Sequence, residues 1–158
     1  HRHRFVSRTA GARIISTAHL KLKLPEHMSQ TIRIRGYHTD SYGHVNNARY
    51  LEFLEDARWA LFERHHLMPQ LQNIQLVVSR MDIRYRRSAT EGDELLSESR
   101  FSNVQSRQIQ LSERLYFNNS GKTVVEAEVT LIPVIDNKVS RLTPEFYQLL
   151  KTLSESVL

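Results

Sequence analysis

One segment limits the possible folds more than any other, because residues 47–65 have the pattern of a helix that is apolar over half of its circumference. On a helical wheel the apolar residues cover an arc of about 180°; they are Tyr50, Leu51, Phe53, Leu54, Ala57, Leu61 and Phe62. A helix of this kind must be covered by other parts of the protein on most sides. Asn46 is a favourable N-cap, and Pro69 prevents the helix from continuing far beyond residue 65.

Most of the remaining chain alternates apolar and polar residues with the period of β-strands. We expect strands over residues 31–37, 74–85, 95–104, 108–117 and 125–131. The alternation changes phase near residues 79–80, which predicts a β-bulge, and residues 118–121 predict a tight turn. A short last helix should begin at Pro144, with Thr143 as its N-cap.

This order of elements predicts an α+β fold, in which an antiparallel sheet wraps around one long central helix. Strands and helices do not alternate regularly, so a doubly wound parallel sheet is not expected. Residues 28–158 are enough for a single domain with a real core.

The formal net charge of +5 belongs to the beginning of the chain. Residues 1–27 hold six basic residues and one acidic residue, which leaves 16 of each sign in residues 28–158. Because that part is neutral, we expect no nucleic-acid partner. Residues 1–27 should lie outside the domain. They fit an extension before a natural start at Met28, a transit peptide or a basic arm that binds acidic partners.

The sequence contains no cysteine. This excludes a disulfide scaffold, a thiolate nucleophile and a Cys-ligated metal site, and it favours a reducing compartment, which we expect to be the cytoplasm. No apolar run approaches the roughly 20 residues that a membrane-spanning helix needs, so we expect no integral membrane association.

Polar residues that can carry chemistry gather in residues 36–50, directly before and at the start of the apolar helix. The N-terminus of a helix offers unpaired N–H groups and a positive dipole end, which can stabilise an oxyanion. Asp40 lies seven residues before Asn47, so it can sit near that terminus without capping it. The pattern fits an acyl-transfer or hydrolysis site. The alternative is a polar loop whose Asp and Asn residues satisfy turns and caps.

Residues 40–50 read D-x-x-G-H-V-N-N-x-x-Y, residues 51–59 read LEFLEDARW, and residues 83–89 read IRYRRSA. These segments resemble the hot-dog-fold acyl-CoA thioesterases of the 4-hydroxybenzoyl-CoA thioesterase-like group. Within that group the chain is most similar to the FadM-type long-chain acyl-CoA thioesterases. The likeness covers about residues 30–140. Gly43 follows the benzoyl-CoA pattern, where the long-chain type can carry a larger residue.

The resemblance implies roles for five residues of the loop and helix. Asp40 matches the catalytic carboxylate, which acts as a general base on water or as a nucleophile. The backbone N–H of Asn47 matches the amide that polarises the thioester carbonyl. His44 and Asn46 match positions that orient water or substrate in the acyl-ACP thioesterases of the same fold, and Tyr50 matches a Tyr on the first turn of the helix. We expect all three to be positioning groups.

Six further residues are candidates for substrate binding. Arg84, Arg86 and Arg87 are expected either to grip the phosphates of CoA or to form a solvated face. Arg58, inside the apolar arc, needs a partner, either a structural carboxylate or a substrate phosphate. Leu54 and Met81 are candidates for the acyl site, with core packing as the alternative for Met81.

The function expected from the resemblance is that of a thioester hydrolase of fatty acid metabolism, which cleaves medium-to-long-chain acyl-CoA to free acid and CoA. We expect a homodimer or homotetramer with sites at subunit interfaces, and neither a metal nor a cofactor. His38, Asp40 and His44 are metal-binding residue types, but the resemblance accounts for Asp40 and His44 without a metal. The alternatives are an acyl-ACP thioesterase, a hot-dog dehydratase and a non-catalytic acyl-binding module.

Overall fold

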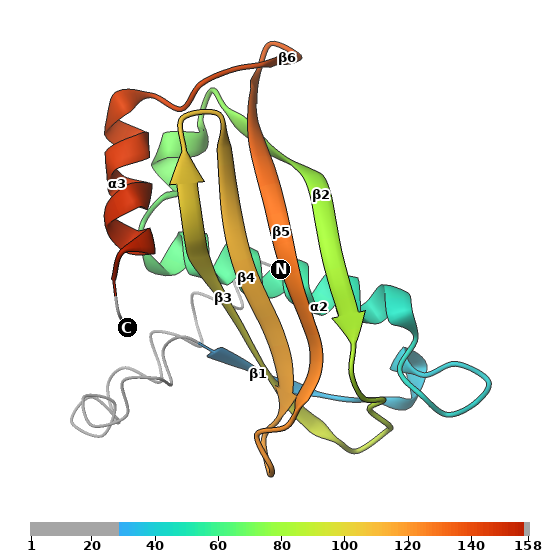
Figure 1. Ribbon diagram of the computed structural model, residues 1–158. Helices are drawn as coiled ribbons and strands as arrows, with labels where there is room; N and C mark the ends of the chain where they lie inside the picture. Colours follow the sequence, from blue (N-terminus) through green and yellow to red (C-terminus); the bar gives the residue numbers. More distant parts are fainter. Residues whose placement is uncertain (1–28, 157–158) are drawn as a thin grey trace.

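The computed structural model describes residues 29–156, so the predictions made for residues 1–27 lie outside the described residues. Figure 1 shows one curved sheet, one long helix across it and a short helix at its side. In chain order the elements are β1 (Ser29–Arg33), the 3₁₀ turn η2 (Gly36–His38), α2 (Asn47–Arg64), η3 (Met68–Leu71), β2 (Gln75–Tyr85), β3 (Glu94–Gln105), β4 (Gln108–Phe117), β5 (Thr123–Ile135), β6 (Lys138–Val139) and α3 (Pro144–Ser154).

The strands form one sheet in the order β1-β3-β4-β5-β2, and β6 pairs with β5. Every pairing is antiparallel. Helix α2 crosses one face of this sheet, and α3 lies beside β3 (Figure 1). The predicted architecture, an antiparallel sheet around one long helix, is therefore confirmed.

The core lies between α2 and the inner face of the sheet. In β4 buried and partly buried residues alternate from Gln108 to Leu115, as expected for a strand with one covered face. Ile109, Leu111 and Leu115 are fully buried there. Phe62 of α2 meets Phe101 of β3 edge to face, with ring centroids 5.4 Å apart. This packing holds the helix at a defined position on the sheet.

Helix α2 begins and ends within one residue of the predicted bounds. The side chain of Asn46 caps it by accepting a hydrogen bond from the Ala48 N–H at 3.0 Å. Leu51 departs from the wheel because it is 40% exposed, whereas Arg58, inside the apolar arc, is 6% exposed as its position predicts although it is charged. Burial on this helix therefore depends on which tertiary neighbours are present as well as on side-chain polarity.

The first strand is shorter than predicted, because it ends at Arg33 and not at residue 37. Ile34 instead bonds across to the turn before β3, donating to the Asp93 carbonyl and accepting from the Gly92 N–H, both at 2.9 Å. The chain then forms the 3₁₀ turn η2.

The bulge predicted near residues 79–80 is confirmed by a register shift between Val78 and Arg80.

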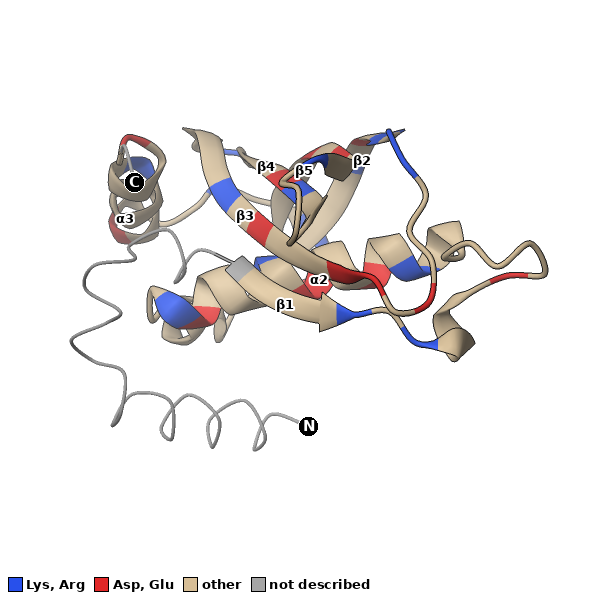
Figure 2. Cartoon of the chain, turned by 90° about the horizontal axis from the view of Figure 1, so that it is seen from below, with Lys and Arg blue, Asp and Glu red and all other residues tan. Residues whose placement is uncertain are grey.

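Charged residues of both signs are interspersed over the strands and α2 in Figure 2. That view shows no face of a single sign, in line with the neutral charge of residues 28–158. Between residues 29 and 156 there is no helix long and apolar enough to cross a membrane.

Candidate functional site

The chain between η2 and α2 forms a closed hairpin. Thr39 and Val45 pair as an antiparallel bridge. Inside it the Asp40 N–H donates to the His44 carbonyl at 2.8 Å, and the Gly43 N–H donates to the Asp40 carbonyl at 3.0 Å. Gly43 has a φ of +80°, the left-handed conformation that glycine adopts most easily. The hairpin therefore presents Asp40 from a tight, internally bonded turn.

The Asp40 carboxylate is held by one of its two oxygens. Its Oδ1 accepts hydrogen bonds from the backbone N–H groups of Tyr42 at 2.9 Å and His44 at 3.2 Å. Within residues 29–156 no group bonds to Oδ2, and the side chain is exposed. One oxygen thus orients the carboxylate, and the other is available to water or substrate.

The hairpin ends directly at the N-terminus of α2. The His38 carbonyl accepts the Asn46 N–H at 2.9 Å, and the Asn46 side chain caps the helix. The N–H of Asn47 is the first of the helix, and the described part of the chain offers it no acceptor. An unpaired N–H at a helix N-terminus is a donor suited to a developing oxyanion.

Ala89 joins the two sequence segments on which the resemblance rests. Its carbonyl accepts the Val45 N–H at 2.9 Å, and its own N–H donates to the Tyr50 hydroxyl at 3.0 Å. His44 forms an isolated bridge with Thr90 next to it. Residues 83–89 therefore help to build the hairpin site. The sequence motif alone did not predict this role for Ala89.

Tyr50 lies below the hairpin, not on the surface. It is 2% exposed, and its ring lies 6.0 Å from that of Tyr85. Burial raises the pKa of the Tyr50 phenol, and the negative charges of Asp93 and Asp40 add to the rise. The phenol therefore stays protonated at neutral pH and supports the hairpin through Ala89.

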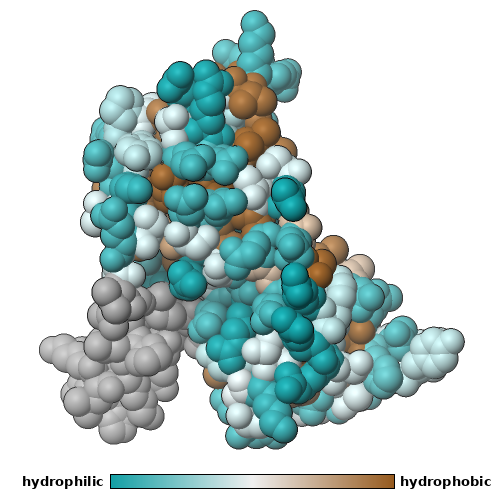
Figure 3. All heavy atoms as spheres, viewed as in Figure 1, coloured by the Kyte–Doolittle hydropathy of each residue, from teal (hydrophilic) through white to brown (hydrophobic). Residues whose placement is uncertain are grey.

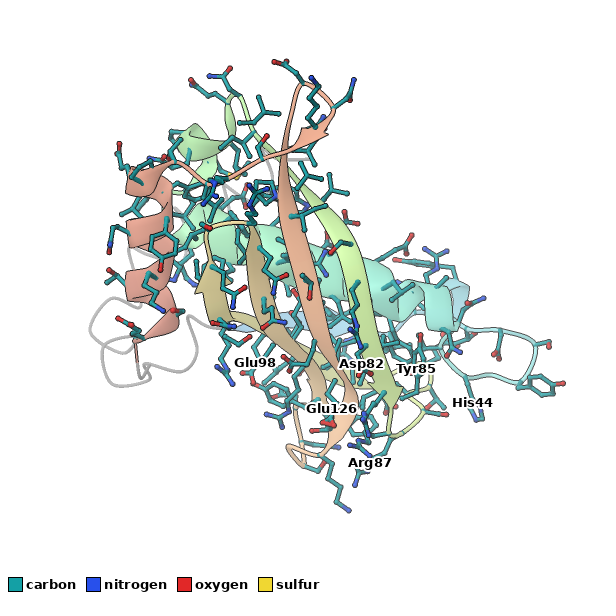
Figure 4. All side chains as sticks on the ribbon, turned by 45° about the horizontal axis from the view of Figure 1, so that its top comes forward. His44, Asp82, Tyr85, Arg87, Glu98 and Glu126 are labelled. Carbon is teal, nitrogen blue, oxygen red and sulfur yellow. The ribbon has the colours of Figure 1, made fainter. Side chains whose placement is uncertain are left out.

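The three arginines expected to grip phosphate differ in their bonds. Arg86 donates twice to the Glu126 carboxylate, with Nη2 at 2.6 Å and Nε at 3.0 Å, and Arg87 donates to the Thr123 carbonyl at 2.7 Å. For the exposed Arg84 no side-chain partner is found among the described residues. Figure 4 labels Arg87 and Glu126 at the end of the sheet where Tyr85 and His44 also lie. Arg84 is thus the guanidinium of the three that is open to an anionic ligand.

Arg58 forms an ion pair in the core. Its Nε and Nη2 each bond one oxygen of Glu113 at 2.9 Å, and the Ser99 hydroxyl donates to the same carboxylate at 2.9 Å. The side chain of Glu113 is 0% exposed. Of the two partners expected for Arg58, the structure supplies the structural carboxylate. The sequence did not reveal Glu113, because it lies 55 residues further along the chain.

The two apolar candidates for the acyl site lie in different environments. Leu54 is 0% exposed inside the core. Met81 of β2 is half-buried and packs against the core from the side. In the part of the chain that the structure describes, no group of three His, Cys, Asp or Glu residues could hold a metal ion.

A family model described as the thioesterase-like superfamily matches residues 34–150, which include the hairpin, α2 and residues 83–89. The chain belongs to the thioesterase-like superfamily.

Similar proteins agree with this membership. The long-chain acyl-CoA thioesterase FadM of Escherichia coli (strain K12) is 39% identical over 116 residues, which are 72% of this chain and 87% of that protein. The crystal structure of YbaW, a probable thioesterase from Escherichia coli, superposes with a TM-score of 0.73 at 35% identity and covers 82% of this chain and 100% of its own. A thioesterase from Thermus thermophilus, complexed with coenzyme A and zinc, has the same fold, with a TM-score of 0.71 at 22% identity over 82% of this chain and 96% of its own.

The comparisons confirm two predictions from the sequence. The fold is the hot-dog fold of these thioesterases, and the chain is a thioester hydrolase of the superfamily.

Proposed function

We propose that the protein hydrolyses acyl-CoA thioesters, with a preference for medium-to-long fatty acyl groups, to free acid and CoA. The observation that carries this proposal is the Asp40 carboxylate, which is oriented through Oδ1 and open at Oδ2, on a hairpin that ends at the unpaired N–H of Asn47. The similarity to a long-chain acyl-CoA thioesterase supports the choice of substrate.

A thioester carbonyl is electrophilic, so a carboxylate and an oxyanion donor suffice without a serine or cysteine nucleophile. Asp40 Oδ2 removes a proton from the attacking water, or attacks the carbonyl itself to give a mixed anhydride that water then cleaves. In both routes the Asn47 N–H donates to the carbonyl oxygen as negative charge develops there, and CoA leaves as its thiolate. His44 and Asn46 position the hairpin and the helix start, and Tyr50 supports them from below.

We assign the grip on the CoA phosphates to Arg84 first, because Arg86 and Arg87 already have protein partners. Guanidinium groups bind phosphate with two hydrogen bonds. Met81 and its neighbour Ile83 are both half-buried on β2, and we assign them to the wall of the acyl site.

We further propose a homodimer, or a tetramer built from it, with each site at a subunit interface. Strand β2 pairs only with β5, so its other edge is unpaired among the described residues. Val77, Val78 and Tyr85 of β2 are 41–44% exposed, and apolar residues gather on that side of the molecule in Figure 3. An unpaired strand edge with exposed apolar side chains is a typical association surface.

Residues 28–158 are proposed to form one thioesterase domain with residues 1–27 outside it. The cysteine-free sequence favours a cytoplasmic enzyme.

The test is release of free thiol from a panel of acyl-CoAs, from short to long chains and with benzoyl-CoA included. We expect the highest kcat/KM on medium-to-long chains, and a rate at least about 100-fold lower for Asp40→Asn, as for loss of a general base. The matched control is Asp136→Asn, in the exposed turn between β5 and β6. Absence of hydrolysis on every substrate, or equal rates for Asp40→Asn and wild type, contradicts the proposal.

The same acyl groups carried on acyl carrier protein test the acyl-ACP alternative. If kcat/KM is higher for the acyl carrier protein thioester than for the CoA thioester, acyl-ACP replaces acyl-CoA as the proposed substrate.

The role of Arg84 is tested with two thioesters of one acyl group, one with full CoA and one with a short thiol that has no phosphate. We expect Arg84→Gln to raise the KM for acyl-CoA about tenfold, in line with loss of a charged hydrogen bond, and to leave the KM for the short thioester unchanged. Arg107→Gln, in the turn between β3 and β4, is the control. An equal effect on both thioesters would remove Arg84 from the phosphate site.

The oligomer is tested by sedimentation equilibrium of wild type, Val78→Lys and the control Val139→Lys on β6. We expect Val78→Lys to shift the mass towards the monomer and to lower activity per chain. A monomeric wild type with full activity would contradict an interface site.

A further inference from the structure

His38 is the only buried histidine among residues 29–156, with an exposed fraction of 8%, and the proposed reaction does not use it. It is the last residue of η2 and comes directly before the hairpin. Its ring contacts Tyr37, with centroids 4.4 Å apart, and meets Phe53 of α2 edge to face at 5.2 Å. A buried polar ring of this kind costs free energy unless its nitrogens are bonded, so its hydrogen bonds define what it does.

The side chain and the main chain of His38 bond in two directions. Nδ1 accepts a hydrogen bond from the Arg35 N–H at 2.9 Å. The His38 N–H donates back to the Arg35 carbonyl at 3.0 Å, and the His38 carbonyl accepts the Asn46 N–H at 2.9 Å. His38, the residue directly before the hairpin, is therefore bonded both to Arg35 at the start of η2 and to Asn46, the N-cap of α2.

The bond to Nδ1 requires one protonation state of the ring. A ring nitrogen that accepts a hydrogen bond carries no proton, so the imidazole is neutral and its proton is on Nε2. A second proton, on Nδ1, would make Nδ1 a donor that faces the Arg35 N–H donor, and this hydrogen bond would break.

We propose that neutral His38 is a positioning residue for hydrolysis, which holds hairpin residues 39–45 so that Asp40 keeps its place relative to the N–H of Asn47, and that its protonation releases the hairpin. This inference rests on the role proposed above for Asp40.

The surroundings of His38 favour the neutral ring. Burial lowers the pKa of His38, the positive charges of Arg49 on α2 and Arg35 before η2 lower it further, and Glu52 on α2 opposes them. Arg49 Nη1 bonds to Glu52 Oε1 at 3.1 Å, and Arg49 Nη2 lies 3.5 Å from the Tyr37 carbonyl. These bonds hold the charges of Arg49 and Glu52 near the His38 ring.

The direction of the pH effect follows from proton linkage. Below pH 6.5, the ordinary pKa of histidine, His38 is protonated in the unfolded chain but remains neutral in the folded protein, because its pKa is lower there. The stabilisation of the hairpin by His38 is therefore complete above pH 6.5 and decreases as the pH falls towards the lower pKa of the folded state. We expect the activity to decrease below pH 6.5 for the same reason.

The experiment compares His38→Asn with His38→Leu in the full chain, with His66→Asn at an exposed site as the control. The Oδ1 of Asn replaces Nδ1 as an acceptor and does not titrate, whereas Leu fills the space without an acceptor. At pH 8 we expect His38→Leu to lower kcat about tenfold with little change in KM, and His38→Asn to keep kcat within about twofold of wild type. Between pH 6.5 and 5 the kcat of wild type should decrease more steeply than that of His38→Asn.

A kcat and a pH profile that are the same in wild type and both variants would overturn the proposal. If His38→Leu does not fold, the pH profile of His38→Asn against wild type decides alone.

Exchange of the Asn46 amide with solvent deuterium provides a readout that does not need hydrolysis. It should be faster in wild type at pH 5 than in His38→Asn, and equal exchange would contradict the proposed release of the hairpin. A wild type that hydrolyses no thioester would refute the proposed function, and the exchange measurement would still test His38.

Discussion

Two carboxylates in this protein illustrate two different uses of an acid. Asp40 lies on an exposed hairpin, bonded through one oxygen to two backbone N–H groups and open at the other. Glu113 lies in the core between the sheet and α2, where both of its oxygens are bonded by Arg58 and one also by Ser99. The first acid keeps a free oxygen for chemistry, whereas the second has no accessible surface and can only hold the helix against the sheet.

The comparison separates function from stability. A surface carboxylate that accepts backbone N–H bonds costs little to change, since an amide still supplies one acceptor oxygen. A buried ion pair that loses one member leaves an uncompensated charge in the core. The predictions below test this separation, in order of decreasing effect.

The largest expected effect is on turnover in Asp40→Asn. Because the Asn side chain still accepts the N–H bonds of Tyr42 and His44, the free energy of unfolding should change by less than about 0.5 kcal/mol. The rate should fall by about 10² to 10⁴. Urea unfolding and thiol release on the same preparation measure both. A large loss of stability would mean that Asp40 resembles Glu113 and is chiefly structural.

Arg58→Met should destabilise the fold by about 3–5 kcal/mol, because it leaves the Glu113 charge buried without its partner. The double variant Arg58→Met with Glu113→Leu should recover most of this loss, since it removes both charges. Urea unfolding at a fixed protein concentration measures the difference. Arg58→Met with full stability and reduced affinity for CoA would instead assign Arg58 to the substrate.

Tyr50→Phe should cost about 1–3 kcal/mol, because the buried N–H of Ala89 loses its acceptor. The hydroxyl does not reach the reacting atoms in the proposed mechanism, so the loss in kcat should be much smaller than that of Asp40→Asn. Equal losses in the two variants would move Tyr50 from the supporting structure into the chemistry. Phe53→Leu is a control for a change of ring packing on the same helix.

The smallest effect is expected for Gly43→Ala. No atom lies within 4 Å of the added Cβ, so the cost comes from the φ of +80° alone and should be about 1–2 kcal/mol. A small fall in the melting temperature with the acyl-chain preference unchanged would assign Gly43 to the turn. A changed preference with no change in stability would give it a part in substrate selection.

Local pattern predicted a large part of this protein. The alternation from Gln108 to Leu115, the apolar arc of residues 47–65 and the caps Asn46 and Thr143 all appear in the structure as expected. These features depend on the period of the backbone and on neighbours a few residues away, so they can be read from a linear chain. The first strand was predicted too long, because the pairing of Ile34 with the turn before β3 is a contact across 58 and 59 residues.

The sequence by itself determined the two helices, the five longer strands, the order in which they occur and the motif of residues 40–50 that marks the family. Only the tertiary structure decided which polar groups meet: Arg58 with Glu113, Tyr50 with Ala89, and Arg86 with Glu126. Each of these pairs joins residues about forty or more positions apart. For the two buried pairs the physical reason is that the sheet must close over α2 before a buried charge or N–H loses water, and only then does its choice of partner affect the free energy. The exposed pair Arg86–Glu126 meets because strand β2 pairs with β5.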